Sequence, residues 1–382
     1  MNNTILKSNK YKICIVKQSA IEYSETFIRN HIERLPSVVG VLSENSLPSY
    51  LDETGCRKNK NSLFHDPYRL MWRAGISFRN CYRELKSSFF LLRHSINGVL
   101  AEYGPAGIAM MRTCEKLGIP LIVHFHGVDA YHSSILSGAG RLYPELFKKA
   151  AAVVAVSHDM EDQLLKLGAP RNKLHYNPCG VDIEIFQRGN PAQAPPTFLS
   201  VGRFVDKKAP HLTILAFNKV IKQIPNARLV MVGNGLLLEA CKQMVRALNI
   251  AGSIEFLGVL SNIGVADLMR KVRALVQHSC QTSYGDSEGT PLSVLEAGAS
   301  GVPVVATKHA GIGDVVIDGM TGYLIDEGNI EKMAEKMFVL GSNPSLAEKL
   351  GLAARDKICR EFSMDQRIDN LWKIIESSIG RN

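Results

Sequence analysis

Short apolar runs alternate with longer amphipathic stretches along the whole chain. The runs are apolar on both faces, which is typical of strands in a parallel sheet that helices cover on both sides. The intervening stretches, for example 211–224 and 236–250, have the apolar spacing of amphipathic helices. We therefore predict strand–helix–strand units and an α/β fold built on parallel sheets. The predicted strands are 12–18, 38–43, 97–104, 120–127, 151–157 and 173–181, followed by 197–203, 227–235, 253–258, 274–279 and 302–307.

One segment interrupts this pattern. Residues 187–196, QRGNPAQAPP, are rich in Pro, Gly and Ala and lack periodic apolar positions, as is typical of a linker. We expect one Rossmann-like domain over residues 1–186 and a second over residues 197–364. Open α/β sheets bind ligands at the carboxyl ends of their strands, so we expect the two sheets to face each other across a ligand-binding cleft.

The composition fits a soluble globular protein, since 46% of the 382 residues are hydrophobic and 21% are charged. No apolar run approaches the roughly 20 residues of a membrane-spanning helix, and the polar N-terminal residues do not resemble a signal peptide. The eight cysteines are scattered without the spacing of a zinc site. We therefore expect a cytoplasmic protein that begins near Met1, has reduced thiols and needs neither a metal nor a cofactor.

Most of the net charge of +9 lies in residues 57–93, which hold nine basic and two acidic side chains and thus a net +7. Aromatic and aliphatic residues are interleaved with the basic ones. This composition favours contact with an anionic membrane surface, at the inner face of the membrane. A pair of ordinary helices with a solvated basic face would give the same pattern, so both interpretations stay open. No recognition motif accompanies the charge, and we expect no nucleic-acid partner.

The most informative motif is SEGTPLSVLEA at 287–297, which follows the strand predicted at 274–279. Thr290 can cap a helix and Pro291 suits its first turn, so we predict a helix that starts at the carboxyl edge of the second sheet. Backbone amides from Gly289 through Leu292 would then form a site for a phosphate group.

Two glutamates flank this predicted helix start. Glu288 precedes it and could accept hydrogen bonds from sugar hydroxyls, whereas Glu296, about two turns into the helix, could accept them from a ribose. Two acidic residues at a helix start can also serve only to offset the helix dipole. We expect Glu288 and Glu296 to bind substrate.

A second motif, VGRFVDKKA at 201–209, follows the first strand of the second domain. Arg203 and Lys208 could converge on one anion from this loop, with Lys207 as a secondary neighbour. A diphosphate leaving group needs cationic stabilisation when its bond to a sugar breaks. Because no D-x-D motif or metal-binding carboxylate cluster is evident, we expect Arg203 and Lys208 to supply that charge. A solvated loop is the alternative.

A third motif, HFHGVDA at 124–130, lies where a strand of the first domain ends. We expect His124 and His126 to face opposite sides of the strand, with His126 in the cleft. Its expected role is contact with the donor sugar or phosphate rather than strong base catalysis. A single histidine is more often structural, but here Gly127 and Asp129 follow it at the exit of the strand.

Two smaller groups complete the predicted site. In SETFI at 24–28, Ser24 could cap a helix, while Glu25 and Thr26 would lie near the first sheet's carboxyl edge and contact acceptor or donor. Gly258 and Val259 end the strand at 253–258 and could present backbone groups to the nucleobase. Simple capping and turn chemistry are the alternatives.

Together these motifs resemble those of family 4 of the retaining glycosyltransferases, which have the GT-B fold. The similarity runs from SETFI to the last helix and is most specific across GRFVDKK, VGNG, FLG and EGTPLSVLEAGASGVPVVAT. The resemblance implies that the second domain binds the nucleotide-sugar donor and the first binds the acceptor. It also implies that a final helix, within 365–382, packs back onto the first domain. SETFI followed by HFHG is similar to members that build exopolysaccharide or lipopolysaccharide.

By this resemblance, Arg203 and Lys208 hold the diphosphate, and His126 lies near the reacting sugar. Glu288 would bind the donor sugar and Glu296 the ribose.

Three positions depart from the family pattern. The first loop reads QSAIEYSE where a glycine pair is common, which argues against a donor-phosphate contact from this loop. Ala209 replaces the glycine that usually follows the lysine. Gly313 and Asp314 stand where Pro-Glu is common.

The expected reaction is retaining transfer of a sugar, with a UDP-sugar favoured as donor, to a glycan or a lipid-linked glycan. The sugar–phosphate bond loosens first, the cations and helix amides stabilise the diphosphate, and the departing phosphate takes the acceptor's proton. A nucleotide-sugar epimerase, a phosphorylase or a non-catalytic sugar-nucleotide-binding protein would carry the same phosphate motifs, and these stay open as alternatives. A dehydrogenase is disfavoured because no predicted strand is followed by G-x-G-x-x-G.

Overall fold

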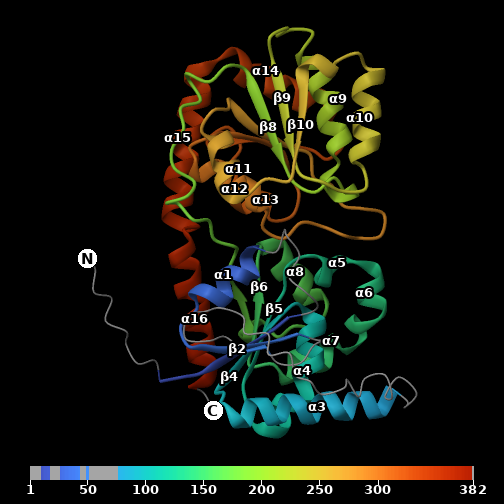
Figure 1. Ribbon diagram of the computed structural model, residues 1–382, viewed down its shortest axis with the longest axis vertical. Coiled ribbons are helices and arrows are strands. Elements are labelled where there is room, and N and C mark those ends of the chain that lie inside the picture. The colour runs from blue at the N-terminus through green and yellow to red at the C-terminus, as the bar shows by residue number, and fades with distance from the viewer. Residues whose placement is uncertain (1–9, 18–25, 44–48, 51–75, 381–382) are drawn as a thin grey trace, which may run out of the picture.

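The computed structural model describes residues 10–17, 26–43, 49–50 and 76–380, with only the backbone described for 49–50 and 76–82. These residues form two α/β units stacked along the long axis of the molecule, each built on its own sheet (Figure 1). Ser24, Glu25 and residues 57–75 of the basic segment lie outside the described residues.

The first unit has a sheet in the order β3-β2-β1-β4-β5-β6-β7. Its strands are β1 (Ile13–Lys17), β2 (Val38–Ser43), β3 (Ser49–Tyr50), β4 (Gly98–Glu102), β5 (Leu121–His124), β6 (Ala152–Ala155) and β7 (Leu174–Tyr176). Its helices are α1 (Thr26–Arg34), α3 (Ile76–Arg93), α4 (Gly104–Leu117), α5 (Val128–Tyr131), α6 (Ser133–Ser137), α7 (Tyr143–Lys149) and α8 (His158–Lys166).

The second unit has a sheet in the order β10-β9-β8-β11-β12-β13. Its strands are β8 (Thr197–Val201), β9 (Arg228–Val232), β10 (Ile254–Gly258), β11 (Ala274–Gln277), β12 (Val304–Thr307) and β13 (Gly322–Ile325). Its helices are α9 (Pro210–Val220), α10 (Leu238–Ala247), α11 (Asn262–Met269), α12 (Leu292–Ala299), α13 (Ile312–Val315), α14 (Ile330–Ser342) and α15 (Pro344–Glu361), and the chain ends in α16 (Met364–Ile379).

The predicted fold class is confirmed: both sheets are parallel, apart from the pairing of β2 with the two-residue β3. Each predicted strand is present: β2 has the predicted bounds, most others are shorter by a few residues, and β7 keeps only Leu174–Tyr176 of the predicted 173–181. Two strands were not predicted, β3 and β13. Both are too short to give a run of apolar positions, since β13 has four residues between a glycine-rich turn and an acidic one.

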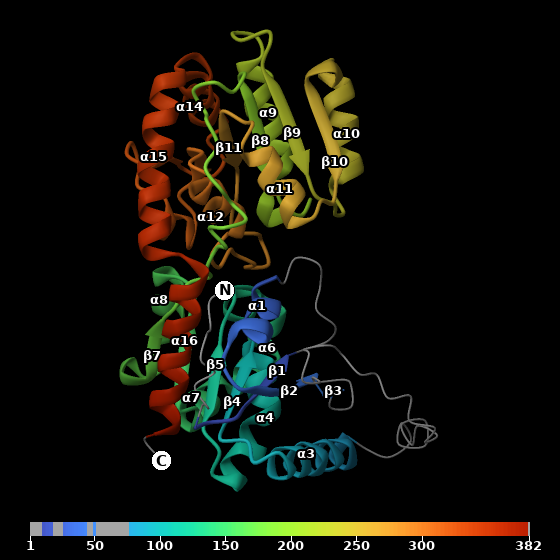
Figure 2. The ribbon, with the colours of Figure 1, turned by 60° about the vertical axis from the view of Figure 1, so that its left-hand side comes forward.

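The last helix crosses from the second unit to the first. Figures 1 and 2 both show α15 and α16 running along one side of the molecule, with α16 beside the first sheet. Ile368, Leu371 and Ile375 of α16 are buried against Ile13 and Leu100 of that sheet. Removing these side chains from water ties the C-terminal helix to the first unit.

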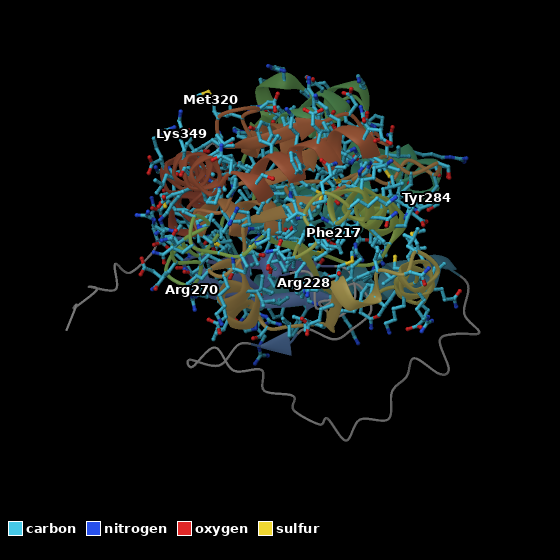
Figure 3. The ribbon with its side chains drawn as sticks, turned by 90° about the horizontal axis from the view of Figure 1, so that it is seen from above. Phe217, Arg228, Arg270, Tyr284, Met320 and Lys349 are labelled. Carbon is cyan, nitrogen blue, oxygen red and sulfur yellow. The ribbon has the colours of Figure 1, made fainter. Side chains whose placement is uncertain are left out.

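The second unit has its own core beneath α9 and α14. Phe217 of α9 is fully buried there, whereas Met320 is 61% exposed. Seen from above, Phe217 lies within the unit while Met320 and Lys349 lie at its rim (Figure 3). Among the helices that the structure describes, none has both the length and the apolar composition needed to cross a bilayer.

The segment predicted as a linker is held in place by one buried arginine. Arg273 donates hydrogen bonds to the carbonyl oxygens of Pro191 (2.8 Å) and Ala194 (2.5 Å). The same guanidinium also bonds the carbonyls of Leu340 and Gly341 at the end of α14. A guanidinium has five N–H donors, so it can satisfy several backbone carbonyls of a segment without regular structure. The entry of the chain into the second unit is therefore fixed to its core.

Candidate functional site

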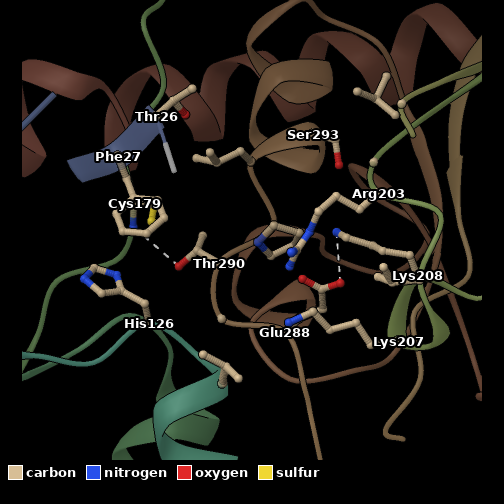
Figure 4. Close-up of a pocket in the computed structure, with 18 of the residues that line it drawn as sticks. Thr26, Phe27, His126, Cys179, Arg203, Lys207, Lys208, Glu288, Thr290 and Ser293 are labelled. Carbon is tan, nitrogen blue, oxygen red and sulfur yellow. Dashed lines mark hydrogen bonds and ion pairs between the residues drawn. The ribbon is translucent and has the colours of Figure 1, made fainter. Parts of the chain in front are cut away.

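A cleft of about 970 Å³ lies between the carboxyl ends of the two sheets and is lined by both units. The first unit contributes Lys17, Thr26, Phe27, Ile28, Tyr103, His126, Val128, His132 and Cys179. The second unit contributes, among others, Arg203, Lys207, Lys208, Val259, Leu260, Glu288, Gly289, Thr290, Pro291, Leu292, Ser293 and Glu296. The structure thus brings most of the predicted residues to one cavity (Figure 4).

Helix α12 points its N-terminus into this cleft. It begins at Leu292, with Pro291 directly before it, and its first amides have no acceptor within the helix. The prediction that Thr290 caps this helix was wrong. The Thr290 hydroxyl instead donates to the carbonyl of Val156 and accepts from the amide of Cys179 (3.4 Å), both in the first unit. Thr290 therefore links the two units beside the cleft and leaves the helix amides open.

The two units touch directly at this point. A Cβ atom added to Gly289 would lie 2.4 Å from the carbonyl oxygen of His126, so only glycine permits this approach. Nearby, the Asp314 carboxylate accepts from the amide of His158 (2.9 Å), the first residue of α8. Asp314, which stands with Gly313 where the sequence departs from the family pattern, therefore contacts the first unit and does not line the cleft.

The central ion pair of the second unit joins Lys208 to Glu288. Lys208 Nζ lies 2.9 Å from Glu288 Oε1, and the Ser279 hydroxyl donates to the same oxygen (3.2 Å). Burial opposes ionisation of this carboxyl, but Lys208 and Lys207 outweigh burial and hold its pKa at about 2. Glu288 is therefore ionised at neutral pH, and it fixes the ammonium of Lys208 at the cleft wall.

The neighbouring cations have different positions. Lys207 is buried, and its Nζ contacts Asp286 (3.1 Å) and the carbonyl of Ser287 (3.2 Å), so it anchors the loop before Glu288. Arg203 is exposed and lines the cleft, and Figure 4 shows it extending with Lys208 toward Glu288. Two cations therefore meet near the start of α12 and a third supports the loop.

The lysine loop has a strained exit. Ala209 has φ 34°, in the left-handed region, and it directly precedes α9. Glycine adopts this conformation without a steric penalty. The family's usual glycine at this place thus has a physical reason, and Ala209 keeps the same turn at some conformational cost.

Glu296 lies one turn into α12 rather than two, because the helix begins at Leu292 and not earlier. Burial raises the pKa of its carboxyl to about 7, and Lys208 only partly offsets this. Glu296 therefore changes charge near neutral pH, whereas Glu288 does not.

Gly258, the last residue of β10, and Val259 directly after it have different positions. Val259 lines the cleft. Gly258 is not among the lining residues, and its carbonyl accepts a hydrogen bond from the amide of Gly233 (2.7 Å). This bond joins the β9 and β10 loops below the cleft.

On the first unit, the two histidines do not face opposite sides. Their ring centroids are 4.3 Å apart, and both approach the carboxylate of Glu102. The expectation was wrong because residues two apart in a strand share a face, and because β5 ends at His124. His126 does line the cleft, as predicted, while His124 is buried behind it.

Glu102 is a residue that sequence reasoning missed. It ends β4 and is fully buried, and its two carboxylate oxygens contact His31 Nδ1 (2.7 Å) and His126 Nε2 (2.6 Å). A usable signal was present, since a lone acidic residue ends the apolar run GVLA at 98–101 and a buried charge is almost never unpaired. Its partner His31 is 71 positions away and carries no such signal.

The ring of His126 is held on several sides. It stacks on Phe27, with 4.3 Å between centroids, and meets the edge of Tyr103 at 4.9 Å. The carboxylate of Asp129 accepts from the amides of His126 (3.0 Å) and Gly127 (3.1 Å), and so shapes the turn after β5. Asp129 is therefore a structural residue of the HFHGVD motif.

Among the residues that the structure describes, one group of side chains has the spacing of possible metal ligands. Atoms of His31, Glu102 and His124 lie within 4.8 Å of one another. However, two ligands of a tetrahedral zinc ion, each about 2.0 Å from it, would be roughly 3.3 Å apart. Within this group, Glu102 lies 2.7 Å from His31 Nδ1, a hydrogen-bond distance, and 3.7 Å from His124 Nδ1. The other close contact of Glu102, at 2.6 Å, is to His126, which lies outside the group. The arrangement is that of a carboxylate shared by two imidazoles.

Comparisons with known proteins agree with this geometry. The family model "Glycosyltransferase Family 4" matches residues 27–185, and "Glycosyl transferases group 1" matches residues 181–357. A glycosyltransferase of Methanocaldococcus jannaschii, MJ1178, whose function is uncharacterised, is 30% identical over 325 residues, which cover 83% of this chain and 85% of that protein.

Two further proteins are similar to this chain. WcaL of Escherichia coli K12, named as a glycosyltransferase of colanic acid biosynthesis, is 28% identical over 244 residues, 62% of this chain. The match spans only 60% of the length of WcaL. Among solved structures, HepE of Anabaena in complex with UDP superposes with a TM-score of 0.76 at 16% identity, over 96% of this chain and 100% of that one.

Proposed function

Because this chain belongs to glycosyltransferase family 4, we propose that it moves a sugar from a nucleotide-sugar to a glycan or lipid-linked glycan acceptor, with retention and without a metal ion. The observation that carries the proposal is the Lys208–Glu288 pair at 2.9 Å, beside Arg203 and the open start of α12. These groups offer positive charge and amide donors to a diphosphate, and a carboxylate to sugar hydroxyls.

The chemistry follows from the charges around Glu288. As the sugar–phosphate bond loosens, Arg203, Lys208 and the first amides of α12 stabilise the negative charge that gathers on the leaving diphosphate. A carboxyl whose pKa is about 2 is a weak base, so Glu288 is suited to hold sugar hydroxyls and not to remove a proton. The departing phosphate takes the proton of the acceptor hydroxyl on the same face of the sugar.

We further propose UDP as the nucleotide and surface polysaccharide as the product. Support comes from the UDP complex of HepE and from the naming of WcaL for colanic acid biosynthesis. Glu296 would accept hydrogen bonds from the ribose, and Val259 would lie beside the base. Thr26 and His126 line the opposite wall, where the acceptor and the donor sugar would meet.

A thermal-shift screen with UDP-, GDP- and ADP-sugars tests the donor, because a ligand that binds only the folded protein raises its melting temperature. We expect the largest shift with a UDP-sugar and no further shift on adding Mg²⁺ or EDTA. Product analysis then separates the classes. A transferase consumes donor only when an acceptor is present, whereas an epimerase interconverts sugars without one. Interconversion without acceptor would contradict the proposal.

We also propose that the first unit contacts an anionic membrane through α3. Its Phe90 and Leu91 are buried in the unit, whereas Leu85, Phe89 and Leu92 are more than 60% exposed. The three exposed residues follow the spacing of one helical face, and the guanidinium of Arg93 lies 5.9 Å from the Phe89 ring. An apolar stripe within a segment of net charge +7 matches an anionic lipid surface in both hydrophobicity and charge.

A further inference from the structure

The buried carboxylate of Glu102 is surrounded by imidazoles from two directions. His31 of α1 approaches one oxygen at 2.7 Å, and His126, just beyond β5, approaches the other at 2.6 Å. An ionised carboxylate can only accept hydrogen bonds. Both ring nitrogens that face it must therefore carry protons.

The protonation of Glu102 is settled by these neighbours. Burial alone would favour the neutral acid, but His31 and His126 outweigh it and hold the pKa of Glu102 far below its ordinary value. The residue is therefore a carboxylate, and an acceptor, at neutral pH.

For His126 this arrangement leaves one nitrogen toward the substrate. Nε2 is bonded to Glu102, and no hydrogen bond to Nδ1 is formed by the described residues. The ring cannot readily turn, because it stacks on Phe27 and contacts the edge of Tyr103. His126 lines the cleft with 3% of its side chain exposed, and since its Nε2 is bonded to Glu102, Nδ1 is the nitrogen left for a ligand.

We propose that Glu102 is a positioning residue: it holds neutral His126 as the Nε2–H tautomer, so that the bare Nδ1 accepts a hydrogen bond from a sugar hydroxyl in the cleft. The substrate part of this inference rests on the proposed glycosyl transfer. The tautomer part depends only on the contacts around Glu102. The imidazole would orient the hydroxyl and would not need to take its proton.

Other titratable groups also surround His126. His124 of β5 lies behind it, with Nδ1 3.7 Å from Glu102, and burial lowers the pKa of His124 well below its ordinary value. The carboxylate of Asp129 in α5 accepts from the backbone amide of His126, and Lys17 at the end of β1 lines the same wall. Glu102 is the charged group in direct contact with the ring, so its removal should change the tautomer of His126 most.

Nitrogen-15 NMR of histidine-labelled protein tests the tautomer directly, with the His126 signal assigned from its loss in His126→Phe. In the wild type at pH 8 we expect a protonated Nε2 and a bare Nδ1. In Glu102→Gln the carboxamide can donate to Nε2 as well as accept from it, so part of the His126 signal should change to the Nδ1–H form. The kcat/KM of Glu102→Gln at pH 8 should fall about tenfold, the effect of weakening one hydrogen bond to substrate.

Glu145→Gln is the matched control, because this carboxylate pairs with Lys149 on the surface of the same unit. We expect it to leave both the His126 tautomer and kcat/KM unchanged. A wild-type His126 with its proton on Nδ1, or an unchanged His126 tautomer in folded Glu102→Gln, would overturn the inference. The wild-type spectrum decides even if the variant does not fold. The spectrum also requires no enzyme turnover. A wrong tautomer can therefore be told apart from a failure to detect glycosyl transfer.

Discussion

The two walls of the cleft each contain a buried carboxylate at the carboxyl edge of a sheet, but its partners differ. On the second unit, Glu288 pairs with Lys208 at 2.9 Å. On the first unit, Glu102 pairs with the imidazoles of His31 and His126 at 2.7 and 2.6 Å. Both carboxylates stay ionised, since the pKa values of both lie far below the ordinary range.

The difference matters because an ammonium keeps its charge through neutral pH, whereas an imidazole has its ordinary pKa close to it. A leaving diphosphate is always an anion and needs constant positive charge. A sugar hydroxyl is neutral and is recognised by a nitrogen whose proton is fixed by a neighbour. The wall from the second unit is thus suited to stabilise the charge of the diphosphate, and the wall from the first unit is suited to orient a sugar hydroxyl.

Removing the fixed charge should have the largest effect. We predict that Lys208→Ala or Arg203→Ala lowers kcat by about 10²-fold or more, as the loss of one preorganised stabiliser of transition-state charge does. Steady-state kinetics with saturating donor would measure this. Lys219→Ala is the control, because Lys219 makes a surface pair with Glu331 outside the cleft. Wild-type turnover in both cleft variants would refute the division of roles between the walls.

Glu296 should give an intermediate effect that depends on pH. Its pKa of about 7 means that the carboxylate which can accept from both ribose hydroxyls forms as the pH rises through neutrality. We predict that nucleotide affinity increases from pH 6 to pH 8. Glu296→Gln should bind about tenfold more weakly at pH 8, the effect of losing a charged hydrogen-bond acceptor, and should lose the pH dependence. Calorimetric titration with UDP at the two pH values measures both.

A rise in pH strengthens nucleotide binding through Glu296, but the same carboxyl should make the folded protein less stable as the pH rises. The folded protein keeps this proton up to about pH 7, whereas the unfolded chain releases it near pH 4.5. The folded state thus binds more protons between these values, and stability falls there as the pH rises. Glu296→Gln should therefore raise the melting temperature at pH 8 by about 2–4 °C, and should have little effect at pH 4.5. A lower melting temperature at pH 8 would contradict the assigned burial.

The smallest effect on catalysis should come from the outer face of the first unit. We predict that Phe89→Ser weakens binding to anionic vesicles about fivefold, from the partial loss of one inserted aromatic side chain. Turnover of a water-soluble acceptor should be unchanged, because α3 does not line the cleft. Co-sedimentation with vesicles containing an anionic lipid measures the binding, and neutral vesicles give the reference. Equal binding of wild type and Phe89→Ser would remove the membrane proposal.

Local sequence patterns located the second wall well. Lys208 lies in the loop after β8, and Glu288 and the start of α12 lie after β11 in the chain, so a strand prediction also predicts that they share one sheet edge. The contacts in the first wall could not be predicted from local sequence patterns. The partners of Glu102 come from α1 and from the turn after β5, and no periodicity relates residues 71 positions apart.

Contacts between the two units also could not be predicted from local sequence patterns. Thr290 has the sequence context of a helix cap, yet its hydroxyl bonds Val156 and Cys179 of the other unit. Asp314 accepts from the amide of His158 in the same manner. Both side chains satisfy backbone groups that come close only when the two sheets face each other. The parallel sheets themselves were predictable, because their strands are apolar on both faces.

The most direct test is a crystal structure with UDP in the cleft. We expect the pyrophosphate between Lys208 and the start of α12, with oxygen atoms within hydrogen-bond distance of Lys208 Nζ, the Arg203 guanidinium and the amides of Leu292 or Ser293. Density for the phosphates elsewhere, with Arg203 and Lys208 turned away from the gap between the units, would contradict it.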